Sequence, residues 1–378
     1  MGRSDCRICS KFFTLNNYIC FFTKIFCKRY YRQCCKRIKI ERKFIMFTQS
    51  QIDQFHHDGT IVAKNLIRGK ELEKLQEAAD KVVNNAIENK PQDISNNEEE
   101  KEFIWKDLDG YMLKKDGRHI YRRSSNMFDR DPVFKAVCAN PEMLKHYGQL
   151  IGHSFVPADD AMVVKVPHGD VPVLWHQDPP YLRKDWDKLQ RIPNIDCDIY
   201  LDHSTKENGC LWGIPNHHLV GHIEIENFTE EELFNCPGII PFETEPGDVI
   251  FHSLSAPHGS AGNKTNGLRR TFYIHFNNKE IYEQCYAGSS AAIKRKEQRD
   301  GWFYDFDEKT KNKLIEMNDL RRSMGFDMLK DDEILISNEG FEYVGEGPKT
   351  PPYHWETLTK KIDPERRKEL KKLEIIPR

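Results

Sequence analysis

The tripeptide His176-Gln177-Asp178 constrains the fold of this 378-residue chain more than any other feature. In an extended strand the side chains of residues i and i+2 point to the same face, so the imidazole and the carboxylate can reach one point in space. A second histidine, His258, follows about 80 positions later and can supply a third ligand. An isolated H-x-D is usually an ordinary surface or turn segment. Together with His258, it predicts a metal site between two strands that are distant in sequence.

The same region carries an arginine that fits this interpretation. Two histidines and one carboxylate on one face of a metal are typical of non-heme Fe(II) oxygenases, which keep open positions for a cosubstrate and O₂. Arg269 follows His258 by eleven residues, and a planar guanidinium suits recognition of a carboxylate. Arg270 is the fallback for this role, and a solvated pair at the start of a strand is the alternative for both arginines.

Four stretches of the sequence resemble the phytanoyl-CoA dioxygenase family of Fe(II)- and 2-oxoglutarate-dependent oxygenases, in the family's order and spacing. They are His176–Tyr181, Glu207–His218, Pro246–His252 and His258–Arg270. The resemblance covers roughly residues 46–280. It implies that Fe(II) is held by His176, Asp178 and His258, that Arg269 anchors the distal carboxylate of 2-oxoglutarate, and that O₂ is the oxidant.

The resemblance also implies further contacts to 2-oxoglutarate and a type of reaction. Ser260 matches a family hydroxyl that touches this cosubstrate, although an ordinary turn residue is an equal alternative. Arg122 is the counterpart of a basic residue before the barrel, with Arg123 as the alternative. Because Asp178 is retained, the implied reaction is hydroxylation of a small-molecule substrate at an unactivated C–H bond, with release of succinate and CO₂. The alternative is a non-catalytic cupin-like module that binds a metal or a ligand.

One position departs from the family pattern. Asp198 stands where the family usually has an aromatic residue, often Trp. If the strand alternates, Asp196, Asp198 and Tyr200 point into the barrel, and a buried carboxylate needs a partner. A polar substrate pocket and an exposed strand edge both remain open, and the departure weakens any transfer of a fatty acyl-CoA substrate.

The apolar pattern predicts strands separated by Pro, Gly and Asn, which favours a double-sheet β-barrel over a parallel α/β sheet. The predicted strands are 60–67, 161–166, 173–177, 197–201, 211–215, 248–253 and 271–276. Helices are predicted over 48–58, 71–86, 131–151, 308–324 and 364–373, and a polar loop over 92–101. With the resemblance, the expected fold is α+β: a double-stranded β-helix, or jelly-roll barrel, flanked by helices.

Residues 1–45 differ from the rest of the chain. They hold twelve of the 57 Lys and Arg residues, two of the 59 acidic residues and six of the eleven cysteines. We expect a poorly ordered basic extension. A cleaved organelle-targeting segment and a zinc knuckle built on Cys6 and Cys9 with Cys34 and Cys35 are the alternatives. We expect residues 46–300 to form the dioxygenase jelly roll with its N-terminal helices, and residues 301–378 a helical extension packed on the barrel.

The charge and the cysteine content of the chain limit its possible partners and its cellular compartment. Removing the extension leaves 45 basic and 57 acidic residues, a net charge of −12, which argues against nucleic acid. No stretch predicts a membrane span. The five remaining cysteines are scattered, so we expect a reducing, cytoplasmic location and a small-molecule partner whose identity, like the oligomeric state, stays open. His217, His218 and His222 have spacing that could bind zinc, with a structural role as the alternative.

Overall fold

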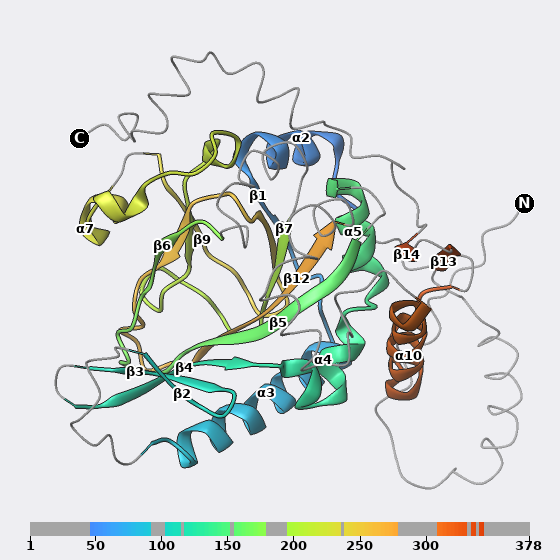
Figure 1. Ribbon diagram of the computed structural model, residues 1–378, viewed down its shortest axis with the longest axis horizontal. Helices are drawn as coiled ribbons and strands as arrows, with labels where there is room; N and C mark the ends of the chain where they lie inside the picture. Colours follow the sequence, from blue (N-terminus) through green and yellow to red (C-terminus); the bar gives the residue numbers. More distant parts are fainter. Residues whose placement is uncertain are drawn as a thin grey trace, which may run out of the picture. The chain divides into compact units, whose positions relative to one another are not determined.

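The computed structural model describes residues 46–91, 103–114, 117–151, 155–178, 195–235, 238–278, 308–330, 334–337 and 340–343. Within them, two antiparallel sheets form the centre of the fold (Figure 1). The larger has the order β1-β10-β7-β12-β5-β4-β3-β2 and the smaller β6-β11-β8-β9. This is the α+β double-stranded β-helix expected from the sequence.

The strands have the following bounds. The larger sheet contains β1 (Thr60–Ala63), β2 (Phe103–Lys106), β3 (Asp109–Leu113), β4 (His119–Ser125), β5 (Phe155–Lys165), β7 (Ile195–Tyr200), β10 (Val249–Ser253) and β12 (Arg269–Asn278). The smaller sheet contains β6 (Val173–His176), β8 (Leu211–Gly213), β9 (Ile240–Phe242) and β11 (His258–Ser260). A separate hairpin pairs β13 (Ile334–Ser337) with β14 (Gly340–Tyr343). All of these pairings are antiparallel.

Helices accompany the sheets along the chain. They are α2 (Gln49–Asp58), α3 (Lys70–Glu88), α4 (Pro132–Val137), α5 (Pro141–Ile151), α7 (Glu230–Phe234) and α10 (Glu308–Met324), with short 3₁₀ turns at Met127–Asp129, His217–Leu219 and Ile225–Asn227.

The predicted single helix over 131–151 is wrong, because the chain breaks between α4 and α5. The side-chain oxygen of Asn140 accepts hydrogen bonds from the backbone N–H groups of Glu142 and Met143 (both 3.0 Å), and Pro141 begins the new helix.

The predicted strand over 60–67 is too long, since β1 ends at Ala63. Asn65 has φ 51°, and its backbone N–H donates to Oδ1 of Asp248 (2.7 Å). The neighbouring turn requires glycine at position 247, where φ is 89° and a Cβ would lie 2.0 Å from the carbonyl oxygen of Ile67. The segment after β1 therefore docks on the turn that leads into β10.

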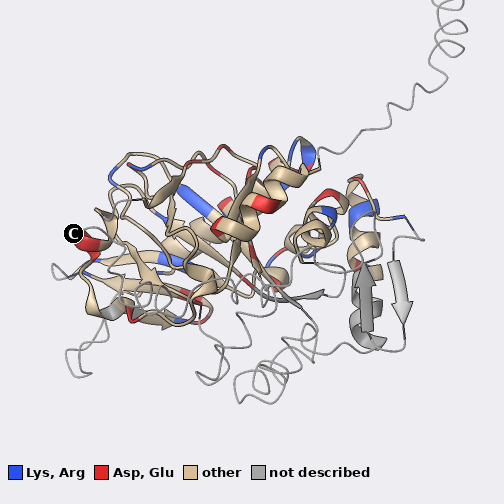
Figure 2. Ribbon diagram, turned by 90° about the horizontal axis from the view of Figure 1, so that it is seen from above, with Lys and Arg blue, Asp and Glu red and all other residues tan. Residues whose placement is uncertain are grey.

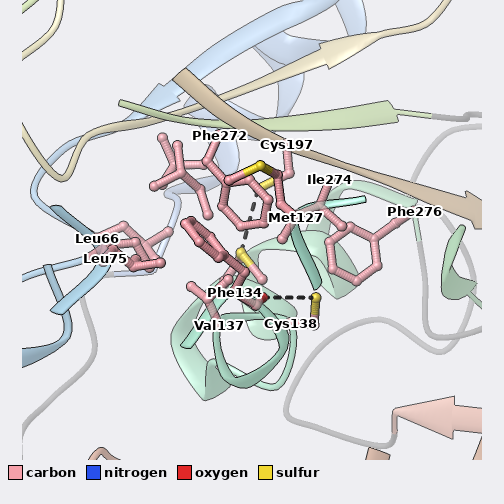
Figure 3. Close-up of a cluster of buried hydrophobic side chains, with 14 of the residues drawn as sticks. Leu66, Leu75, Met127, Phe134, Val137, Cys138, Cys197, Phe272, Ile274 and Phe276 are labelled. Atoms are coloured by element: carbon pink, nitrogen blue, oxygen red, sulfur yellow. Dashed lines mark hydrogen bonds between the residues drawn. The ribbon is translucent and has the colours of Figure 1, made fainter. Parts of the chain in front are cut away.

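The two faces of the larger sheet differ in chemistry. On β7 the odd-numbered residues Ile195, Cys197 and Ile199 are fully buried in the main hydrophobic core. Figure 3 shows part of this core, where Phe134 and Val137 of α4 lie against side chains from β7 and β12. Apolar side chains from the sheet and the helices thus form one continuous core.

The opposite side of the larger sheet, called the inner face below, turns toward the smaller sheet. Tyr200 and Ile250 on this face pack with Leu211 of β8 and with Phe242 of β9. By alternation and register, the inner face carries Asp196, Asp198 and Tyr200 of β7, His252 of β10, and Arg269, Thr271, Tyr273 and His275 of β12. A polar lining therefore lies between the two sheets, while apolar residues fill the other side.

The predicted helix over 308–324 is present as α10, which packs against α4. The guanidinium of Arg321 is fully buried and donates to both carboxylate oxygens of Glu71 on α3 and to the carbonyl oxygen of Ala136.

Figure 2 shows basic and acidic residues mixed along the described elements. No helix in the described ranges has the length and apolar character needed to cross a membrane.

Several predictions fall outside the described residues. They concern the extension over 1–45, the loop over 92–101 and the helix over 364–373.

Candidate metal centre and the residues around it

His176, Asp178 and His258 come together at the edge of the smaller sheet. His176 ends β6 and His258 begins β11, and the two residues are partners in the antiparallel register. Their ring centroids are 4.3 Å apart. Asp178 places Oδ1 3.7 Å from Nε2 of His176 and Oδ2 3.7 Å from Nε2 of His258. The three side chains offer ligand atoms that all lie within 4.8 Å of one another.

Backbone hydrogen bonds orient both imidazoles toward this point. Nδ1 of His176 lies 2.7 Å from the carbonyl oxygen of Leu174, and Nδ1 of His258 lies 2.9 Å from that of Ala256. Because a carbonyl oxygen can only accept, each Nδ1 carries the proton and donates. Each Nε2 therefore keeps its lone pair for a metal, which is the usual arrangement of a ligating histidine.

The electrostatics of the group also suit a divalent cation. Burial would raise the pKa of Asp178, but His258 and His176 outweigh it and lower that pKa to about 2. Burial, with His176 beside it, lowers the pKa of His258 to about 3. At neutral pH the site thus offers a carboxylate and an uncharged imidazole. Three ligands fit a centre with open positions, whereas a structural zinc site needs four.

Gln177, between two of these residues, was not singled out from the sequence. Its side chain is buried and donates to the carbonyl oxygens of Gly221 (3.0 Å) and Ser255 (2.7 Å), while its oxygen accepts from the N–H of Ile223 (2.8 Å). These bonds tie the end of β6 to the loop that leads to His258. From the sequence, the available indication of this role was the position of a glutamine between two candidate metal ligands.

Arg269 lies on the inner face with its guanidinium buried, at 3% exposure. Nη1 donates to the hydroxyl of Thr271 (2.7 Å), Nη2 donates to the carbonyl oxygen of Gly209, and Nε has no hydrogen-bond partner among the described residues. No described carboxylate forms an ion pair with it, and burial lowers its pKa. A buried guanidinium with a free N–H and no counter-ion has the chemistry of a carboxylate-binding site.

The Glu-Asn-Gly segment allows this arrangement. Gly209 has φ 85°, and a Cβ there would lie 2.2 Å from the carbonyl oxygen of Ala261. Only glycine permits this approach, which brings its carbonyl oxygen to Arg269.

Arg270 points to the other face of β12. It donates through Nε and Nη2 to the two carboxylate oxygens of Asp202 (both 2.8 Å) and through Nη1 to Asp80 of α3 (2.5 Å). The adjacent arginines thus differ in their partners: acids surround Arg270, whereas no acid in the described ranges pairs with Arg269.

The other residues expected to contact 2-oxoglutarate lie in the same region. Ser260 is buried in β11, and its carbonyl oxygen accepts from Nζ of Lys165 (3.5 Å). Burial lowers the pKa of Lys165, and Arg269 and Arg122 lower it further. Arg123 is in register with Val163 of β5 and lies over the ring of Tyr273, 5.3 Å from its centroid. Arg122 and Arg123 therefore both remain candidates.

The interpretation of Asp196 and Asp198 as an exposed strand edge is wrong. Both carboxylates are buried on β7, which lies between β10 and β12. Asp196 Oδ2 is 2.7 Å from Nε2 of His275, and Asp198 Oδ2 is 3.5 Å from Nε2 of His252. Burial disfavours the charged form of His252, but Asp198 outweighs it and raises the pKa of this histidine to about 9.

The histidines after β8 form no metal site in the described part of the chain, where the triad is the one group of three or more metal-ligating side chains. Nε2 of His218 lies 3.2 Å from the carbonyl oxygen of His56, and burial lowers the pKa of His218 to about 3. A neutral, buried histidine bonded to a carbonyl supports the structural interpretation.

Comparisons with known proteins agree with the geometry. The phytanoyl-CoA dioxygenase (PhyH) family matches residues 55–271. The chain is 32% identical over 146 residues to the methylphosphonate hydroxylase of Gimesia maris, covering 37% of this chain and 53% of that protein. It is 24% identical over 194 residues to the 2-aminoethylphosphonate dioxygenase of an uncultured bacterium, covering 46% of this chain and 68% of that protein.

Among solved structures, EctD from S. alaskensis with 2-oxoglutarate and 5-hydroxyectoine has a TM-score of 0.47 and 20% identity, covering 62% of this chain and 77% of that one.

The chain spans about half the length of the methylphosphonate hydroxylase. Because the family match extends over more than half of the sequence, the chain belongs to the phytanoyl-CoA dioxygenase family.

Proposed function

We propose that this protein is an Fe(II)- and 2-oxoglutarate-dependent dioxygenase that hydroxylates a small molecule at an unactivated C–H bond and releases succinate and CO₂. The convergence of His176, Asp178 and His258 on one point is the observation that carries the proposal. When bound, Fe(II) with 2-oxoglutarate and O₂ supplies the oxidising chemistry, which belongs to these groups rather than to the protein.

The residues of the chain hold and orient the reactants. The two Nε2 atoms and the Asp178 carboxylate hold Fe(II), and the Leu174 and Ala256 carbonyls fix the imidazole tautomers. Arg269 binds the distal carboxylate of 2-oxoglutarate through the N–H groups that no described acid occupies. Ser260 and either Arg122 or Arg123 add contacts to the same cosubstrate.

The substrate is small and polar. Two relatives are named for the hydroxylation of methylphosphonate and for a dioxygenase reaction on 2-aminoethylphosphonate. The buried Asp196 makes the inner face unsuited to a bare hydrocarbon chain, because an apolar group would leave Oδ1 of this carboxylate without a hydrogen bond. Small phosphonates and related polar acids are therefore the first candidates to test.

The test is succinate formation from 2-oxoglutarate in the presence of Fe(II) and O₂. We expect iron-dependent succinate release by the wild-type protein, and its loss in His176→Ala, Asp178→Ala and His258→Ala. His203→Ala is the matched control, because this histidine pairs with Glu245 at the surface (2.9 Å) and should not matter. Undiminished succinate release by a protein lacking both His176 and His258 would overturn the proposal.

A further inference from the structure

One carboxylate oxygen beside the candidate metal centre has no partner. Asp196 is 3% exposed, and its Oδ2 lies 2.7 Å from Nε2 of His275. Its Oδ1 is buried and has no hydrogen-bond partner among the described residues. An unpaired buried acceptor is destabilising, and more so when it is charged. Such an atom in a native structure calls for an explanation, and a bound ligand is one.

This oxygen lies on the inner face close to the triad. Asp196 is flanked across the strands by His252 of β10 and by His275 of β12. The ring of His252 is 4.6 Å from the ring of His258. Burial raises the pKa of Asp196 to about 6, with His275 opposing the shift and the nearby Asp178 adding to it. A group bound at Oδ1 would therefore sit within the same interior region as the metal ligands.

The chemistry of the oxygen limits what can bind it. Oδ1 is an acceptor, so its partner must be an N–H or O–H donor. A fully deprotonated anionic group has no proton to donate to this oxygen, and a hydrocarbon would leave it unpaired. Of the common substituents on small metabolites, hydroxyl and amino groups satisfy these conditions.

We propose that Asp196 is a substrate-binding residue that accepts a hydrogen bond from a hydroxyl or amino group of the substrate and thereby selects donor-bearing small molecules. The proposal rests on the dioxygenase function proposed above. His275 holds the second carboxylate oxygen and so fixes the direction of the first. Because the substrate donor is anchored near the metal ligands, the neighbouring carbon atoms are the ones presented for hydroxylation.

The experiment uses two matched trios of probes with the wild-type enzyme, loaded with Fe(II) and 2-oxoglutarate without O₂. The first trio is ethylphosphonate, 2-hydroxyethylphosphonate and 2-aminoethylphosphonate; the second is propionate, 3-hydroxypropionate and 3-aminopropionate. Members of each trio differ only in the terminal donor, and calorimetry measures their dissociation constants. In at least one trio, we expect a donor-bearing member to bind at least about tenfold more tightly than the plain acid. The dissociation constants of the hydroxyl-bearing and amino-bearing members of a trio show which donor is preferred.

Asp196→Asn then tests the residue, because an amide that accepts from His275 turns its N–H₂ group toward the substrate. This variant should lose the preference for donor-bearing probes. Glu245→Gln is the matched control, since Glu245 also pairs with a histidine but is 69% exposed, and it should keep the preference. The proposal is overturned if the wild-type enzyme shows no preference, if none of the six probes binds, or if Asp196→Asn retains the preference.

Two further measurements on the same preparations separate this inference from the dioxygenase function. Iron content and iron-dependent succinate formation test the dioxygenase alone. Normal succinate formation without a donor preference refutes the role of Asp196 only. Absence of iron-dependent succinate refutes the dioxygenase function, whatever the probes show.

Discussion

Adjacent arginines on β12 should have separable effects when each is replaced by alanine. Arg269 is buried without a described carboxylate partner, and we expect it to bind 2-oxoglutarate. A charge-assisted hydrogen bond contributes about 1.5–3 kcal/mol, so Arg269→Ala should raise the KM for 2-oxoglutarate by at least about tenfold. Iron content should hardly change. Arg269→Lys should recover only part of the loss, since an ammonium cannot form the planar fork.

Arg270→Ala should instead lower stability. It removes the guanidinium that pairs with both oxygens of Asp202, a side chain at 18% exposure, whereas Asp80 is 58% exposed and contributes little. Breaking such a buried pair costs about 3 kcal/mol, which lowers Tm by several degrees. The KM for 2-oxoglutarate should stay near the wild-type value.

Steady-state kinetics with varied 2-oxoglutarate, calorimetry of its binding and thermal unfolding measure these effects side by side. A large KM effect in Arg270→Ala together with an unchanged KM in Arg269→Ala would refute the assignment of the cosubstrate anchor. It would also mean that the cosubstrate lies on the other face of β12.

Four further results are expected. Gln177→Ala should weaken Fe(II) affinity by about 10–100-fold in metal titrations, because its three hydrogen bonds hold the segments that carry the ligands; an unchanged affinity would argue against this positioning role. Burial lowers the pKa of His56 to about 4 and that of His218 to about 3, so between pH 6.5 and 4 the unfolded chain binds protons that the folded chain does not. The free energy of unfolding should therefore fall as pH falls through this window, by up to about 1.4 kcal/mol per pH unit for each histidine, and urea titrations of His218→Gln should show a shallower dependence. Arg321→Met should cost about 3–5 kcal/mol in chemical denaturation, and replacing its glutamate partner by Gln as well should restore part of this loss. A chain that begins at Met46 should keep its melting temperature and its activity, and a large drop in either would show that residues 1–45 support the fold.

Local sequence patterns predicted the strands of the barrel well, for a simple physical reason. On β7 and β12 every second residue enters the apolar core, and this period appears directly in the sequence. The predicted ranges included no strand at β2 to β4, β9, β11, β13 or β14. The apolar alternation is weak on β4, where Arg122 and Arg123 stand next to each other, although Tyr111 of β3 and Tyr121 of β4 reach the main core. The break between α4 and α5 was missed because one apolar pattern continues across Asn140.

The sequence alone indicated the triad, because H-x-D in extended backbone brings two ligands to one side and His258 could supply the third. In the structure His176 ends β6, and Asp178 lies just beyond the strand. The sequence also indicated that Arg269 and Arg270 point in opposite directions. Only the tertiary structure decided what each side chain meets. It paired His258 with His176 and surrounded Arg270 with acids. It left Arg269 without a described acidic partner and one oxygen of Asp196 without a described hydrogen-bond partner. These contacts join residues that are far apart in sequence, so their chemistry depends on strand order and register, which local patterns do not contain.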